Sequence, residues 1–233
     1  MKLAILLIAI GFMFGCTDQN AYLIRVEQDA VFVGNKKVAN TNDVAKQDSF
    51  LVEALHKALQ ALESKKDTSK NCQIKIDPEQ SYNVFYKIAN TCKLSGYTKF
   101  SIISKINGED YTQFFSLNNK EETFFKNFEG PPFEVGILVR NLTVVIDKDY
   151  FEIRALGGHS PKIFHKENLD FAYNELANLL IKVHNLTKDS YFDGGIGYIE
   201  ANNDIKISNL IPVMHGFRTA GVTTINLLVY KRK

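Results

Sequence analysis

Five histidines are the side chains of this sequence best suited to proton transfer or metal binding near neutral pH. The stretch GGHSPKIFH brings His159 and His165 into one predicted loop and strand, a weak candidate for a metal site. The other three, His56, His184 and His215, fall on predicted helices without a second ligand at the usual spacing. We therefore predict no metal site and no cofactor.

Catalytic motifs are also missing from the sequence, which contains no HExxH, GxxxxGK or GxSxG pattern. The run DGGIG at 193–197 precedes a predicted strand, so it offers no helix N-terminus to a phosphate. Asp77 could act as an acid or base, but Asp-Pro at a strand end is typical of a turn whose carboxylate bonds nearby amides. We predict a protein that is not an enzyme. A paired-carboxylate site for sugar cleavage stays open, because a sequence does not show distances in space.

Cys72 and Cys92 are expected to face each other. Cys72 begins a predicted strand ended by Asp77-Pro78, and SYNVFYKIANTCKLSG then predicts a helix that ends before Gly96. Five strand residues at ~3.3 Å and about eleven helical residues at 1.5 Å cover similar lengths, which puts both cysteines at one level. A disulfide here would close a loop of about twenty residues and stabilise the fold by ~3 kcal/mol. The alternative is a pair of buried thiols.

The first apolar run, from Leu3 to Cys16, is too short to span a membrane, since ~21 Å of helix faces a hydrocarbon core of ~30 Å. With Lys2 before it and small residues at its end, the run is typical of a secretory signal. The residues MFGC resemble a bacterial lipobox, which predicts removal of residues 1–15 and lipidation of Cys16. An ordinary signal peptide with an incidental cysteine is the alternative. We expect a periplasmic, lipid-anchored protein, and Thr17 favours the outer membrane over the inner.

Composition is that of a packed globular protein, with 45% hydrophobic and 23% charged residues. The net charge of +2 gives no reason to expect nucleic acid as a partner.

A divergent internal repeat organises the remainder of the chain. Each copy reads as a hairpin, an amphipathic helix, a strand, a second helix closed by glycine, and a last strand, or β-β-α-β-α-β. We predict an α+β fold of two tandem two-layer sandwiches, each with helices on one face of a mixed sheet. The expected domains are residues 21–118 and 136–233, joined by a linker at 119–135 after a tether at 16–20. Aligned positions include Ile74 with Ile199, Phe85 with Leu210, Ile88 with Val213, and Gly96 with Gly221.

Two further features support this organisation. The helices FLVEALHKALQALES and LDFAYNELANLLIKV each place leucines on one face. Between the copies, Asn107-Gly108 predicts a hairpin turn, with Tyr111 to Leu117 returning as an extra strand. The polar stretches KDTSK and NKKVANTNDVAK are expected to be solvated loops.

The first copy resembles the periplasmic domain of the ExbD/TolR family of biopolymer-transport proteins. The resemblance rests on YLIRVEQDAVFVGNKKV, on IKID ending in Asp77, on Tyr82 after the turn, and on Gly96 before FSIIS. The second copy has Asn202 in place of Asp77, Ile207 in place of Tyr82, and retains Gly221. Family members also carry a membrane helix with an aspartate for proton-driven coupling, and the apolar run here holds no acidic residue.

The resemblance implies a periplasmic module that dimerises and, in TolR-like members, contacts peptidoglycan. Two copies in one chain would make that dimer internal, which lowers the entropic cost of association. We expect a non-enzymatic binding or scaffold lipoprotein of the cell envelope that contacts peptidoglycan or an envelope transport or motor complex, with a membrane contact through its lipid alone. The alternative is a periplasmic solute-binding module that uses a cleft between the copies.

Overall fold

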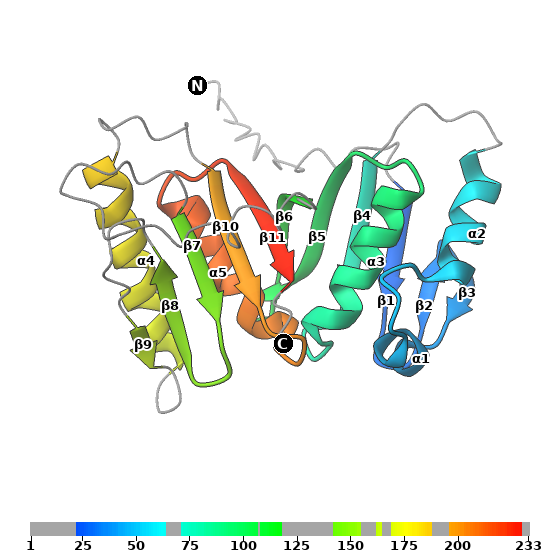
Figure 1. Cartoon of the computed structure of the whole chain (residues 1–233), viewed down its shortest axis with the longest axis horizontal. Helices are drawn as coiled ribbons and strands as arrows, with labels where there is room; N and C mark the ends of the chain where they lie inside the picture. The colour runs from blue at the N-terminus through cyan, green and yellow to red at the C-terminus, as the bar shows by residue number, and fades with distance from the viewer. Residues whose placement is uncertain are drawn as a thin grey trace, which may run out of the picture.

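The strands of both copies belong to one mixed sheet (Figure 1). The computed structural model describes residues 22–63, 71–106, 108–117, 142–154, 162–164, 169–187 and 196–229. Eleven strands are hydrogen-bonded in the order β3-β2-β1-β4-β5-β6-β11-β10-β7-β8-β9, and five helices accompany them. The predicted α+β class is confirmed.

The first copy occupies residues 22–117. Its elements are β1 (Tyr22–Val26), β2 (Val31–Val33), β3 (Lys36–Ala39), α1 (Thr41–Lys46), α2 (Glu53–Glu63), β4 (Asn71–Ile76), α3 (Tyr82–Leu94), β5 (Lys99–Ile106) and β6 (Glu109–Leu117).

The second copy occupies residues 142–229. Its elements are β7 (Leu142–Ile146), β8 (Tyr150–Arg154), β9 (Lys162–Phe164), α4 (Leu169–Thr187), β10 (Ile196–Ala201), α5 (Ile207–Thr219) and β11 (Thr224–Val229). The predicted linker at 119–135 lies outside the described residues.

The internal repeat is visible in matching helix ends. Gly96 and Gly221 follow α3 and α5 with φ of 91° and 86°, a left-handed conformation that glycine adopts without steric cost. Each glycine donates its main-chain N–H to the carbonyl three residues earlier, at 3.0 Å in both copies. The following residue, Tyr97 or Val222, donates to the carbonyl five residues back. This hydrogen-bond pair is a Schellman motif.

Two details of the sequence prediction need correction. Each copy has a third short strand, β3 or β9, so the second copy reads β-β-β-α-β-α-β, and the first has the additional short helix α1 before α2 and the extra strand β6 at its end. NKKVANTNDVAK is not a loop, because it forms β3 and α1. Edge strands of three or four residues carry too few alternating positions for a period-two pattern to stand out. KDTSK lies outside the described residues.

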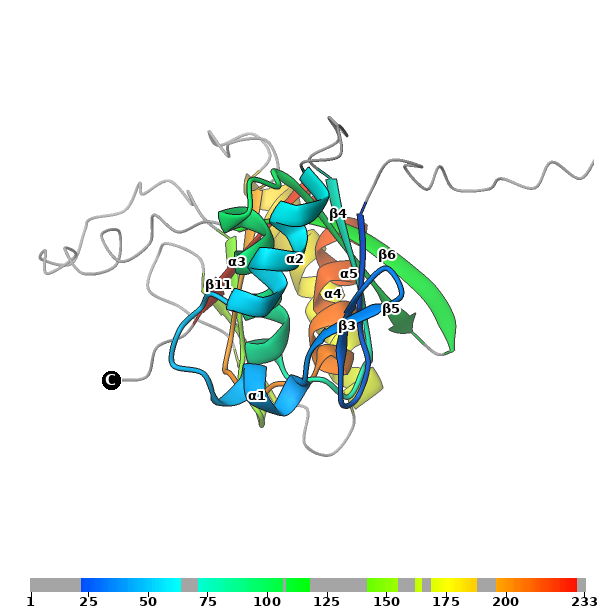
Figure 2. The ribbon, with the colours of Figure 1, turned by 90° about the vertical axis from the view of Figure 1, so that its right-hand side faces the viewer.

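The two copies also differ from the expected separate sandwiches in how they are joined. The predicted extra strand is confirmed as β6, and the hairpin that leads to it closes at Gly108, whose φ is 85°. β6 pairs antiparallel with β5 and parallel with β11 through the residue pairs Ser116–Asn226 and Leu117–Leu227. Figures 1 and 2 show the helices of the first copy in front of its strands and those of the second copy behind theirs.

One core extends through both copies. Leu55 and Leu59 on α2, and Leu176 and Leu180 on α4, are buried as their helical spacing predicts. Helix α3 is buried on nearly all sides, because it contacts α1 and α2 of its own copy as well as α5 of the other.

Candidate functional site at the junction of the two copies

The turns that precede α3 and α5 meet in antiparallel fashion, with Ser81 opposite Lys206. The contact is symmetric, because equivalent residues of the two copies exchange equivalent hydrogen bonds, as in a two-fold dimer interface. The main-chain bonds run from Tyr82 N–H to the Ile205 carbonyl (2.6 Å), from Ile207 to Gln80 (2.9 Å), from Asn83 to Asn203 (3.0 Å) and from Ser208 to Pro78 (2.8 Å).

These bonds satisfy helix N-termini that would otherwise lack partners. The first N–H groups of any helix have no acceptor within the helix itself. In α3 and α5, the first two residues of each helix donate to the turn of the other copy. The ends of both helices are therefore engaged in joining the copies, and an anion would have to break these bonds to bind there.

Tyr82, at the start of α3, makes a fully buried polar contact between the copies. Its side chain is 0% exposed, and its hydroxyl donates a 2.7 Å hydrogen bond to the main-chain carbonyl of Leu228 on β11. Its ring lies 6.3 Å from that of Phe85 and 6.0 Å from that of Tyr86, between centroids. The sequence singles out Tyr82 as a motif position but gives no sign that its partner lies in the other copy.

Asp77 belongs to the turn before this junction, as its sequence context predicts. Its Oδ1 accepts a 2.8 Å hydrogen bond from the main-chain N–H of Glu79. At the equivalent position of the second copy, Asn202 donates to Asp147 Oδ2 at 2.9 Å. Across the junction, Lys206 Nζ lies 2.6 Å from Glu79 Oε2, an exposed ion pair that adds little stability.

A separate polar cluster lies on the face of the second copy's strands that α4 and α5 do not cover. Arg154 contacts Glu152 at 3.1 Å and Glu200 at 3.3 Å. Burial raises the pKa of Glu200, Arg154 opposes that rise, and Glu152 adds to it. Glu200 and Glu152 lie on strands two apart, both opposite Val145. Glu152 and Glu200 are thus a pair of neighbouring carboxylates among the described residues, but one arginine binds both of them.

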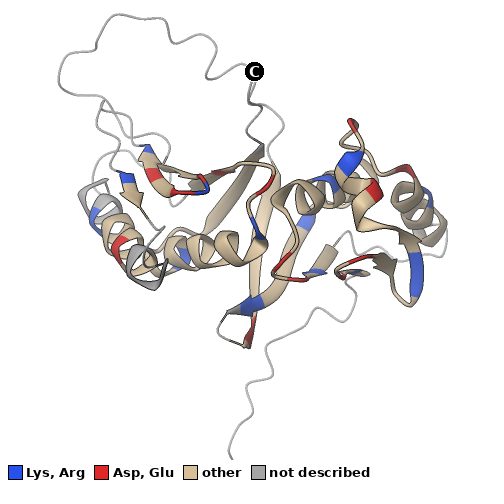
Figure 3. Ribbon diagram, turned by 90° about the horizontal axis from the view of Figure 1, so that it is seen from below, with Lys and Arg blue, Asp and Glu red and all other residues tan. Residues whose placement is uncertain are grey.

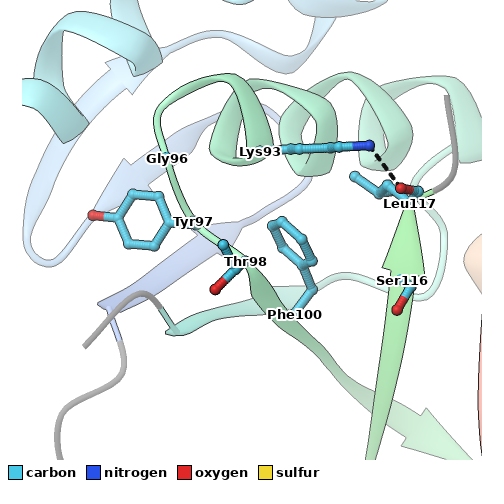
Figure 4. Close-up of a pocket in the computed structure, with 7 residues that line it drawn as sticks. All are labelled: Lys93, Gly96, Tyr97, Thr98, Phe100, Ser116 and Leu117. Atoms are coloured by element: carbon cyan, nitrogen blue, oxygen red, sulfur yellow. Dashed lines mark hydrogen bonds between the residues drawn. The ribbon is translucent and has the colours of Figure 1, made fainter. Parts of the chain in front are cut away.

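One pocket among the described residues lies within the first copy (Figure 4). It has a volume of about 400 Å³ and lies where α3 ends and β5 begins. Lys93 Nζ donates a 2.7 Å hydrogen bond to the Leu117 carbonyl across it. The residues that line it are Lys93, Gly96, Tyr97, Thr98, Phe100, Ser116 and Leu117.

Cys72 and Cys92 lie side by side, as the strand–helix spacing predicts. Their sulfur atoms are 3.4 Å apart, and both residues are at most 1% exposed. They are thiols in this structure, so the disulfide stays a prediction. Burial, together with the neighbouring Cys72, raises the pKa of Cys92 well above its ordinary value.

The structure describes His56 and His215 on different helices. His56, on α2, has its Nδ1 2.7 Å from Ser95 Oγ, and the ring of His215, on α5, contacts that of Tyr111 edge-on at 5.7 Å. His184 lies within α4, whereas His159 and His165 fall outside the described residues. Among the described residues, no group of three or more histidine, cysteine or acidic side chains is placed to bind a metal.

The predicted signal peptide (1–15), the lipidation site Cys16 and the tether (16–20) lie outside the described residues. No helix within the described ranges has the length and apolar character needed to cross a bilayer. No protein-family model matches the chain, and no curated protein matches it significantly.

Proposed function

We propose that this protein is an exported lipoprotein that serves as a non-enzymatic binding or scaffold component of the cell envelope, with two ExbD/TolR-like copies that contact peptidoglycan. The observation that carries the proposal is the junction, in which equivalent turns exchange four main-chain hydrogen bonds and Tyr82 bonds to the other copy. This symmetric pairing supports the internal dimer that the family resemblance implies.

Such a junction suits a scaffold better than a solute-binding protein. Solute sites are concave spaces with a few convergent polar groups. The turns at this junction are paired main chain to main chain, which leaves few polar groups there free to bind a solute. The single sheet that runs through both copies offers broad faces instead, so we propose that the ligand binds on a face of the molecule.

The outer end of the second copy provides such a face. Phe164 on β9 is 68% exposed, and its ring contacts that of Tyr150 on β8 at 5.8 Å between centroids. Lys162 Nζ lies 4.5 Å from the centroid of the Tyr150 ring. We call Tyr150, Lys162 and Phe164 the aromatic edge. Flat rings can pack on the apolar face of a sugar, and the ammonium group can pair with the carboxylates of peptidoglycan.

Retention on purified peptidoglycan sacculi tests this function. We expect the full chain to sediment with sacculi, and the Phe164→Ala and Lys162→Ala variants to be retained on the order of tenfold less. Phe114→Ala is the matched control, because Phe114 is 67% exposed but lies on β6. Retention no greater than that of an unrelated lipoprotein would reject the peptidoglycan contact and leave an envelope protein complex as the partner to seek.

The lipid anchor needs a test of its own. Intact mass of the membrane-extracted full-length protein should show a chain that begins at Cys16 with added acyl mass. The Cys16→Ala variant should lose that mass. A chain that still begins at Met1 would refute the anchor and with it the lipoprotein assignment.

A further inference from the structure

The described turns at the two ends of the strands differ in charge. At one end lie the turns from α3 to β5 and from α5 to β11, at the top of Figure 1. Lys99 and Arg218 are exposed there, and Lys93 is half-buried. The stretches 91–100 and 215–224, which contain these turns, include no acidic residue. We call Lys93, Leu94, Lys99 and Arg218 the basic end.

The opposite end is acidic. It holds the turns that follow β1, β4, β7 and β10, and Figure 3, which views the molecule from this side, shows acidic residues on several of them. Lys148 and Lys206 are the basic residues within these four turns. The acidic ones are Glu27, Asp29, Asp77, Glu79, Asp147, Asp149 and Asp204.

Helix dipoles explain part of this pattern. Lys93 and Arg218 lie in the last turns of α3 and α5, where a positive charge offsets the partial negative charge of the helix end. The dipole does not explain Lys99, which begins a strand, or Leu94, whose side chain is 53% exposed. Single apolar residues are common on protein surfaces, and a surface that meets a membrane interface combines such a residue with Lys and Arg.

The first strand begins at this same end. Tyr22 starts β1, and its ring contacts that of Tyr97 edge-on at 5.7 Å, within the turn that carries Leu94 and Lys99. Tyr22 follows Cys16 by six positions in the sequence. Even fully extended, these positions span roughly 20 Å, since each residue covers at most ~3.3–3.6 Å. A lipid on Cys16 would hold the basic end close to the bilayer surface.

We infer that the basic end docks on the anionic headgroups of the membrane in which Cys16 is anchored. This inference rests on the proposed lipid anchor and adds the orientation of the domain. Each Lys or Arg near an anionic bilayer contributes about 1 kcal/mol of attraction, which corresponds to roughly a fivefold change in binding. The acidic end then faces away from the membrane, and the aromatic edge extends to one side.

Fluorophore labels at the two ends provide the test. The full-length lipidated protein would carry an environment-sensitive fluorophore on Leu94→Cys in one sample and on Glu79→Cys in another, since Cys72 and Cys92 are buried. Both samples would be reconstituted on vesicles of phosphatidylcholine with about one quarter phosphatidylglycerol. With a headgroup quencher in the vesicles, we expect quenching at Leu94 about fivefold greater than at Glu79.

Charge variants distinguish electrostatic docking of the basic end from the proximity to the membrane that the lipid anchor alone would give. Changing Lys99→Glu together with Arg218→Glu should reduce the docked fraction on the order of tenfold, and Lys99→Gln with Arg218→Gln should have an intermediate effect. Vesicles of phosphatidylcholine alone should behave like the charge-reversed variant. Equal quenching at Leu94 and Glu79 while the protein still floats with vesicles would overturn the docking inference alone. Failure of the wild type to float, as expected for Cys16→Ala, would overturn the proposed anchor.

Discussion

The hydroxyl of Tyr82 in the first copy donates a hydrogen bond of 2.7 Å to the main-chain carbonyl of Leu228 in the second. It is a neutral hydrogen bond in a fully buried setting, where an unmade bond costs more than a formed one contributes. It therefore links the stability of α3 to that of β11.

Tyr82→Phe should lower the free energy of unfolding by about 1–3 kcal/mol, because the Leu228 carbonyl loses a buried donor while the ring packing remains. Urea denaturation followed by circular dichroism measures this change. Tyr150→Phe, on the outer hairpin of the second copy, is the control and should change stability by less than about 0.5 kcal/mol. Equal effects of the two variants would show that the bond between the copies contributes nothing.

Gly96→Ala and Gly221→Ala should each destabilise the fold by about 1 kcal/mol or more, because alanine is strained at φ near +90°. Thermal and urea unfolding would both report the loss. Gly216→Ala is the matched control within α5, where the new Cβ would meet Leu180 Cδ1 at an ordinary 3.4 Å. That variant should be neutral or stabilising by up to about 1 kcal/mol. A comparable loss at Gly216 would contradict the conformational explanation.

Oxidation of the Cys72–Cys92 pair should remove two hydrogens from the mass and raise the free energy of unfolding by ~3 kcal/mol. The raised pKa of Cys92 makes its reactive thiolate scarce in the folded protein. We therefore expect the bond to form faster during refolding than in the native state. Mass spectrometry after alkylation in denaturant measures the oxidised fraction. Cys92→Ala, which has no pair to oxidise, should show neither the mass change nor the gain in stability.

Tyr111 should make the protein less stable in alkali. Burial raises its pKa to about 12 from an ordinary 10, although Arg218 lowers it. Between pH 10 and 12 the unfolded chain releases this proton while the folded chain keeps it, so stability falls as the pH rises through that window. The stability difference between wild type and Tyr111→Phe should be constant below pH 10 and shift in favour of the phenylalanine variant above it. A difference that stays constant to pH 12 would refute this explanation.

Local sequence patterns predict much of the fold without reference to any tertiary contact. The alternation in β1 and β8, the leucine stripes of α2 and α4, the Asn107-Gly108 turn and the glycine stops after α3 and α5 all follow from periodicity and backbone conformation. The adjacency of Cys72 and Cys92 follows from arithmetic on a strand and a helix joined by a short turn. Each of these inferences involves residues no more than about twenty apart in the chain.

Local sequence patterns do not predict the candidate site, because its partner residues lie far apart in the chain. Tyr82 was recognisable as a motif position, but its acceptor at Leu228 lies far along the chain and in a strand with no pattern that marks it. The Glu152–Arg154–Glu200 cluster depends in the same way on β8, β7 and β10 lying in register. The short edge strand β3 is not predicted from the sequence, because sheet pairing rather than local propensity creates it.

By itself, the sequence determined the repeat, the class of fold and the local turns, because these depend on interactions between near neighbours. Only the tertiary structure decided that β6 would unite the copies in one sheet, that their helices would cover opposite faces, and that the turns before α3 and α5 would pair. Those outcomes depend on which surfaces bury each other and on which main-chain donors find acceptors across the chain. These contacts depend on packing over the whole molecule, so they cannot be predicted from a single segment of the sequence.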